Sequence, residues 1–160
     1  MSTSIQLIND LYKSINADPH QLQDPNVAHM EINYNRVLGM HAVPGLTIDV
    51  NELSDGIEAQ IALQEGAVVA NPVHLCFGML PKEGVQRIVL DVRIGVQAKV
   101  SLLAHCTFPF AVNVQHLMNA AIEIKEGAEY AYFERHVHSP SGGVVVVPKA
   151  VVEVGPRARF

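Results

Sequence analysis

Cysteine and histidine residues recur along the chain at positions that could together bind a metal ion. The sequence has two cysteines, and each has a histidine within two positions. A further pair of histidines follows thirty residues after the second cysteine. Thiolate and imidazole ligands together suit iron, zinc or copper better than calcium or magnesium. The three groups are His74 with Cys76, His105 with Cys106, and His136 with His138.

These groups fall in step with an internal repeat. Four segments share two alternating apolar residues, a turn, an alanine and another apolar residue two positions later. The alanines recur at intervals of 31, 30 and 30 residues. Such a period predicts a coil that returns above itself, so that residues one period apart lie on adjacent strands ~4.8 Å apart. The segments are 61–69, 92–100, 122–130 and 152–160, and the alanines are Ala67, Ala98, Ala128 and Ala158.

The repeat predicts an all-β fold, a right-handed parallel β-helix or β-solenoid. Its alternating isoleucine, leucine and valine side chains would point inward and form apolar columns. Residues 1–30 are expected to form a short N-terminal helix, which ends at Asp18-Pro19, and a linker. Residues 31–160 are expected to form the β-helix core, which ends with an open turn. The edge strands of an open turn invite pairing with another chain.

Stacking of the coils predicts that the cysteine and histidine groups become neighbours. His105 and Cys106 are adjacent, so they point to opposite faces of their strand. An inward-facing cysteine could instead be an ordinary core residue, because free cysteine is among the most buried residue types. His116 is interpreted as a surface or hydrogen-bonded histidine. The metal candidates are Cys76, Cys106, His74, His138 and Glu134, and the candidates for binding a transient cofactor are Cys76, Cys106, His105, His136 and His138.

Two other functions fit parts of the sequence. A small metal-dependent enzyme on a cupin-like barrel could use His136 and His138. The cupin motif has a carboxylate a few residues after its second histidine, where this chain has the run 139–143, Ser-Pro-Ser-Gly-Gly. A purely structural solenoid that pairs with another copy of itself is the third alternative. The sequence has no G-x-x-x-x-G-K-[ST], G-x-S-x-G or C-x-x-C motif.

Composition narrows the classes of partner. The chain is 49% hydrophobic and 17% charged, which provides one core and argues against a disordered protein. The net charge is −5 without a basic stripe, so nucleic acid is not an expected partner. The N-terminus lacks the features of a secretory signal, and no apolar run reaches the ~20 residues that span a bilayer. A cytoplasmic protein without a membrane partner is therefore expected, and its cysteines are expected to be free.

Three runs of sequence resemble the core domain of the SufB/SufD proteins, the scaffolds of iron–sulfur cluster assembly. The chain resembles a short archaeal-type member or the N-terminal part of that core domain. The family residues most often assigned to cluster assembly have no counterpart here, so the roles given to Cys76, Cys106 and His138 rest on stacking alone. The runs are 72–78, 104–116 and 132–138, the last followed by Gly142-Gly143.

The resemblance implies a right-handed parallel β-helix that serves as an assembly scaffold rather than as an enzyme. It implies contact with iron or a transient iron–sulfur cluster. A SufC-like ATPase is the implied partner. The open edge would pair with a SufB/SufD-type protein or with a second copy of the chain, which makes an oligomer.

Overall fold

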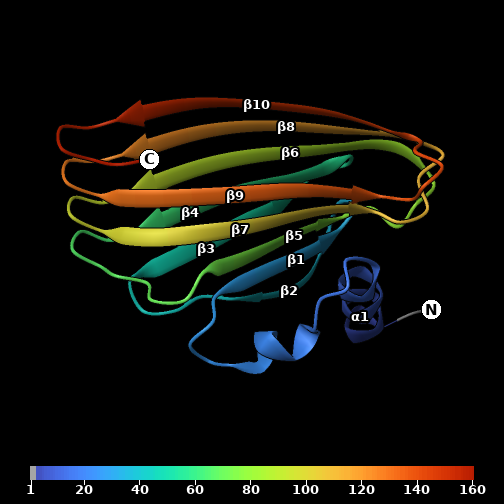
Figure 1. Ribbon diagram of the computed structural model, residues 1–160, viewed down its shortest axis with the longest axis horizontal. Coiled ribbons are helices and arrows are strands. Elements are labelled where there is room, and N and C mark those ends of the chain that lie inside the picture. Colours follow the sequence, from blue (N-terminus) through green and yellow to red (C-terminus); the bar gives the residue numbers. More distant parts are fainter. Residues whose placement is uncertain (1–2) are drawn as a thin grey trace.

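Strands alternate between two facing layers along nearly the whole chain (Figure 1). The structure is a computed structural model and describes residues 3–160. The strands are β1 (His29–Asn33), β2 (Arg36–His41), β3 (Leu46–Glu52), β4 (Gly56–Leu63), β5 (Val73–Gly78), β6 (Glu83–Ile94), β7 (Lys99–Phe108), β8 (Asn113–Ile124), β9 (Glu129–His138) and β10 (Val144–Val154). One sheet has the order β2-β1-β5-β7-β9, and the other has the order β10-β8-β6-β4-β3.

The strands wind into stacked parallel coils, which confirms the predicted β-solenoid, here of about three turns. The alanines of successive repeats lie one above another at a corner of the coil. The amide of Lys99 donates to the carbonyl of Ala67 at 2.8 Å, and the amide of Glu129 donates to the carbonyl of Ala98 at 2.9 Å. About thirty residues therefore bring the backbone round one full coil, as the repeat predicts.

The apolar residues of the repeat form columns between the sheets. Ile61, Val92, Ile122 and Val152 are in register on β4, β6, β8 and β10. The first three are at most 6% exposed. Because each coil can bury its apolar face only against the next coil, this stacked column is the main source of stability.

The two ends of the solenoid differ. At one end β2 pairs antiparallel with β1, and β3 pairs antiparallel with β4. At the other end β9 and β10 are edge strands with one neighbour each among residues 3–160. All strand pairs between these ends are parallel. The cupin-like barrel with His136 and His138 is therefore wrong, because such a barrel closes through antiparallel strands.

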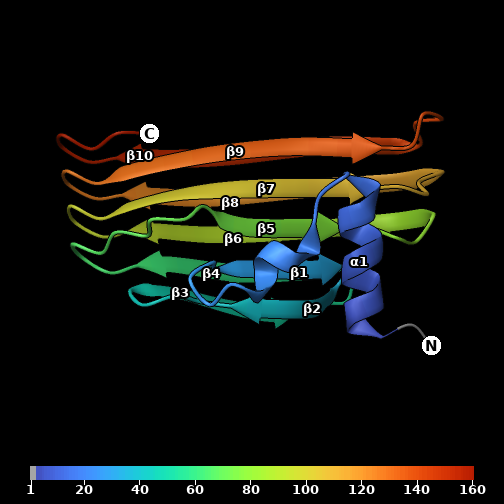
Figure 2. The same cartoon turned by 60° about the horizontal axis from the view of Figure 1, so that its bottom comes forward.

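A helix, α1 (Ser4–Ser14), crosses the outer face of the sheet that contains β5 and β7 (Figure 2). The side chain of Thr3 caps it by accepting from the amide of Gln6. Leu11 and Tyr12 are fully buried against the sheet, whereas Ile5, on the same predicted apolar face, is 73% exposed. A 3₁₀ helix, η1 (Pro19–Gln23), leads from α1 to β1. Within the described part of the chain, no helix is long and apolar enough to cross a membrane.

Candidate metal centre

The register between β5 and β7 decides which cysteine meets which histidine. Val68 bridges Lys99, 31 residues later, but Val73 pairs with Leu102, only 29 residues later. The first coil thus takes two extra residues through the bend before β5. As a consequence Cys76 pairs with His105, and Cys106 pairs with His136.

The two cysteines therefore lie on opposite faces of the same sheet. The outward-facing row runs from Glu31 through Cys76 and His105 to Arg135. The inward-facing row runs from Ile32 through Phe77 and Cys106 to His136. The structure thus does not bring Cys76 and Cys106 together, although both are fully buried and free.

The outward-facing group under α1 is closed by its own hydrogen bonds. We call Tyr12, His29, Glu31 and Cys76 the outer cluster. The hydroxyl of Tyr12 donates to Oε1 of Glu31 at 3.2 Å, and Nδ1 of His29 lies 2.8 Å from Oε2. Burial, with the nearby Glu31 carboxylate, raises the pKa of both the Cys76 thiol and the Tyr12 hydroxyl well above their ordinary values. This packed and neutral thiol is a poor ligand.

The other outward-facing histidines have different neighbours. Nδ1 of His105 accepts from Nε of Arg135 at 3.0 Å, so the His105 ring is neutral. Burial, followed by the charge of Arg135, lowers its pKa to about 4. The rings of His74 and His105 lie 6.4 Å apart. His138 is exposed at the end of β9, where its Nδ1 contacts the carbonyl of Ser139.

Inside the solenoid, three side chains from three strands converge. We call Cys106 of β7, His116 of β8, His136 of β9 and the neighbouring Glu134 the inner cluster. One donor atom from each of Cys106, His116 and His136 lies within 4.8 Å of the other two. The first two residues are fully buried, and the side chain of His136 is 26% exposed. Because β8 belongs to the opposite sheet, the cluster spans the core.

Gln86 fixes which nitrogen of His116 carries the proton. The amide nitrogen of Gln86 donates to the carbonyls of Tyr34 and Gly78, at 2.9 and 2.8 Å. Its Oε1 therefore faces Nδ1 of His116 at 2.8 Å and must accept from it. The proton sits on Nδ1, and Nε2 keeps a free lone pair. That Nε2 atom is buried and has no hydrogen-bond partner.

Glu134 and His136 add two further atoms without hydrogen-bond partners. Oε1 of Glu134 lies 2.8 Å from Nε2 of His136, but neither atom makes a hydrogen bond. Oε2 of Glu134 accepts from the hydroxyl of Tyr132. Buried polar atoms are nearly always paired in folded proteins, so three orphaned atoms beside one thiol point to a missing ligand.

Burial sets the protonation of the inner cluster. It raises the pKa of the Cys106 thiol well above the ordinary value, and Glu134 and Cys76 raise it further. It lowers the pKa of His116 to about 4, with a smaller contribution from His136. The cluster is thus a neutral thiol beside a neutral imidazole at neutral pH. A metal ion would replace the thiol proton, since thiolate is the form that binds metals.

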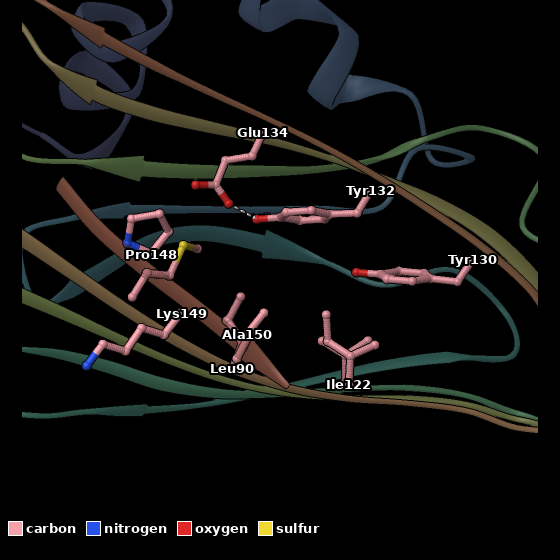
Figure 3. Close-up of a pocket in the computed structure, with 11 residues that line it drawn as sticks. Leu90, Ile122, Tyr130, Tyr132, Glu134, Pro148, Lys149 and Ala150 are labelled. Carbon is pink, nitrogen blue, oxygen red and sulfur yellow. Dashed lines mark hydrogen bonds between the residues drawn. The ribbon is translucent and has the colours of Figure 1, made fainter. Parts of the chain in front are cut away.

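Glu134 also lies at the wall of a cavity of about 220 Å³ between the two sheets. In Figure 3, Tyr130, Tyr132 and Glu134 border one side of this cavity, and Leu90, Ile122 and Ala150 border the other. The lining is mostly apolar, and Glu134 is its one acidic residue. The cavity therefore connects the last coils of the solenoid with the carboxylate beside His136.

The centre differs in membership from the sets expected from sequence. Cys106, His136 and Glu134 lie together, whereas Cys76, His74 and His105 are on the outer face and His138 lies at the open end. His116 and Gln86 were not expected there. His116 is fully buried rather than on the surface, and only one of its nitrogens is hydrogen-bonded.

Comparison with known proteins identifies relatives. No protein-family model matches the sequence, and no solved structure is significantly similar to it. An "iron-sulfur cluster assembly SufBD family protein" of Pyrococcus horikoshii is 29% identical over 151 residues, which cover 94% of this chain and 45% of the relative. A protein of the same description from Methanocaldococcus jannaschii is 26% identical over 147 residues, which cover 92% and 46%.

The chain belongs to the SufB/SufD family. It spans about half the length of the curated relatives it matches. The shared region includes nearly all of the solenoid, because the matches cover more than nine-tenths of the chain. The inner cluster therefore lies in the part of a SufB/SufD protein that these relatives have in common with this chain.

Proposed function

We propose that this SufB/SufD chain is a scaffold subunit of iron–sulfur cluster assembly rather than an enzyme. The observation that carries the proposal is the similarity to two proteins described as assembly proteins of this family. A buried thiol beside imidazoles supports it, because thiolate and imidazole are ligands of iron. Iron and sulfide would be the substrates, and a transient cluster would be the cargo. The two free cysteines suit the reducing conditions of the cytoplasm.

A SufC-like ATPase is the proposed source of energy for assembly. The sequence has no G-x-x-x-x-G-K-[ST] loop to hold nucleotide phosphates, so ATP would be hydrolysed by a partner. The scaffold would respond to the partner through its rigid stacked sheets. This division of labour follows the resemblance to the SufB/SufD family.

The open end of the solenoid is the proposed contact with a SufB/SufD-type protein or with a second copy. Edge strands carry unpaired backbone groups that pair readily with another strand. The outer side of β10 adds apolar surface, since Val145 is 59% exposed and Val151 is 68% exposed. Pairing at β9 and β10 would extend both sheets and cover the cavity beside Glu134.

Anaerobic reconstitution tests the scaffold function. The purified chain is incubated with ferrous iron and sulfide, alone and with a SufC-like ATPase, and its visible absorption is recorded. We expect an iron–sulfur chromophore that Cys106→Ser removes, and co-elution with the ATPase. Cys76→Ser is the matched control, because that cysteine faces away from the core. A chain that forms no chromophore and binds no such ATPase would contradict the proposal. If the Cys76→Ser/Cys106→Ser double variant kept full function, a purely structural solenoid would be the better description.

A further inference from the structure

We propose that the inner cluster is a mononuclear site that binds one divalent transition-metal ion, ferrous iron or zinc, without sulfide. Cys106, His116 and His136 would be the ligands, Glu134 would be the nearest candidate for a fourth, and Gln86 would be a positioning residue. The site is argued from the geometry of this chain alone. It would stand even if the chain were not a scaffold for clusters.

The first argument is the number of unpaired buried atoms. Nε2 of His116, Nε2 of His136 and Oε1 of Glu134 are buried without a hydrogen-bond partner. Each such atom costs about 1–3 kcal/mol when it is left unsatisfied. One cation would satisfy all three, because a ring nitrogen lone pair and a carboxylate oxygen are both electron-pair donors. A second buried hydrogen-bond donor could not do this for all of them without crowding the thiol.

The second argument is the preset tautomer of His116. A histidine binds metal through a nitrogen that carries no proton. In this chain the Gln86 amide is held by two backbone carbonyls, so its oxygen can only accept the proton on Nδ1 of His116. Nε2 is left free, and it faces Cys106 and His136. Outer groups of this kind orient metal-binding histidines in known sites.

The third argument is the chemistry of the donor set. One thiolate, two imidazoles and one carboxylate match zinc and ferrous iron, whereas calcium and magnesium prefer oxygen ligands alone. Binding releases one proton, as the Cys106 thiol becomes a thiolate bonded to the ion. No oxidant or reductant is needed. Four donors around one ion give a single closed site, in contrast to the larger thiolate sets that hold most iron–sulfur clusters.

The outer cluster provides an internal control. Cys76 is as buried as Cys106, but it faces α1 and packs against Leu11 and Tyr12. Both oxygens of the nearby Glu31 already have partners. A Cys76→Ala variant therefore removes a buried thiol of the same exposure without touching the proposed site.

The experiment uses the 160-residue chain, freed of metal and kept anaerobic, with cobalt(II) as the optical probe. Cobalt bound by thiolate gives a sulfur-to-metal charge-transfer band, and tetrahedral cobalt gives intense visible bands. We expect one cobalt per chain, displaced by one equivalent of zinc or ferrous iron. X-ray absorption of the zinc-loaded wild type should show one sulfur at about 2.3 Å and nitrogen or oxygen neighbours at about 2.0–2.1 Å.

Variants assign the signal to residues. Cys106→Ala should lose the charge-transfer band, whereas Cys76→Ala should keep it. Gln86→Leu should weaken binding about 10–100-fold, as changes to orienting groups do. Nitrogen NMR of the metal-free wild type should show His116 protonated at Nδ1, a result that a merely structural role of Gln86 in the fold does not require once the chain is denatured. Circular dichroism checks that each variant is folded.

Two results would overturn the site, even if a variant failed to fold. One is a zinc-loaded wild type whose X-ray absorption has no sulfur neighbour. The other is a cobalt charge-transfer band that survives Cys106→Ala and disappears in Cys76→Ala. Because no sulfide or ATPase is present, these results are independent of the cluster-assembly test.

Discussion

Cys76 and Cys106 lie on opposite faces of one sheet, are equally buried, and have different polar surroundings. Cys76 sits in the outer cluster, where the Glu31 carboxylate is paired on both oxygens. Cys106 sits in the inner cluster, where ring nitrogens of His116 and His136 have no partner. A saturated polar cluster fastens one element to another, whereas an unsaturated one lowers stability until a ligand arrives. The contrast separates a structural role from a binding role.

The largest effect should come from removing the centre of the outer cluster. Glu31→Ala should lower the free energy of unfolding by about 4 kcal/mol, because it leaves the Tyr12 hydroxyl and the His29 ring unpaired under α1. Glu31→Gln should cost less, since its amide oxygen can still accept from Tyr12. Urea unfolding measures both losses. Equal stability of the wild type and Glu31→Ala would show that the outer cluster does not fasten α1.

The inner cluster should behave in the opposite way and respond to metal. At a free metal concentration 100 times the dissociation constant, the wild type should gain about 2.7 kcal/mol of stability. Cys106→Ala should lose that gain, while its metal-free stability falls by only about 1 kcal/mol for the small lost thiol. Urea unfolding with and without zinc provides the measurement. A metal-induced gain that Cys106→Ala retains would place the ion elsewhere.

A smaller effect is expected where α1 meets the end of β7. The hydroxyl of Ser14 donates to the carbonyl of Leu11, so the hydroxyl of Thr107 donates to Ser14 at 2.7 Å. Thr107→Val removes this one bond from a fully buried position and should cost about 1 kcal/mol. Amide hydrogen exchange should locate the loss in α1 and not in the sheets. Thr107→Ser, which keeps the hydroxyl, should leave α1 better protected than Thr107→Val.

Sequence patterns predicted the coils because the repeat constrains them twice, through apolar alternation and through the phased alanines. They did not predict the two-residue slip before β5, since extra residues in a bend leave the alternation unchanged. That slip pairs Cys76 with His105 instead of with Cys106 or its neighbour. Counting from the alanines therefore placed the right residue types on adjacent strands, but it did not resolve which of them share a face.

His116 and Gln86 could have been found from the sequence by another signal. Val114, His116 and Met118 alternate along β8, and the two apolar residues indicate that this face points inward. Gln86 lies thirty residues before His116, one full coil away, so the two polar residues share one inward column. What the sequence could not supply is the distance across the core from β8 to β7. That distance depends on how the two sheets face each other.

The smallest effect we predict concerns the outer face at low pH. His74 is the exception there, since its buried Nδ1 has no hydrogen-bond partner. Burial lowers its pKa, and His29, in register on β1, lowers it further; His105 faces it from β7. Because the pKa is depressed in the folded chain, the unfolded chain takes up more protons once the pH falls below about 6.5, and stability declines with it. His74→Leu should make this decline shallower and should leave the difference between pH 7 and pH 8 unchanged. Urea midpoints across this range measure the slope, and an unchanged slope in His74→Leu would assign the decline to the other buried histidines.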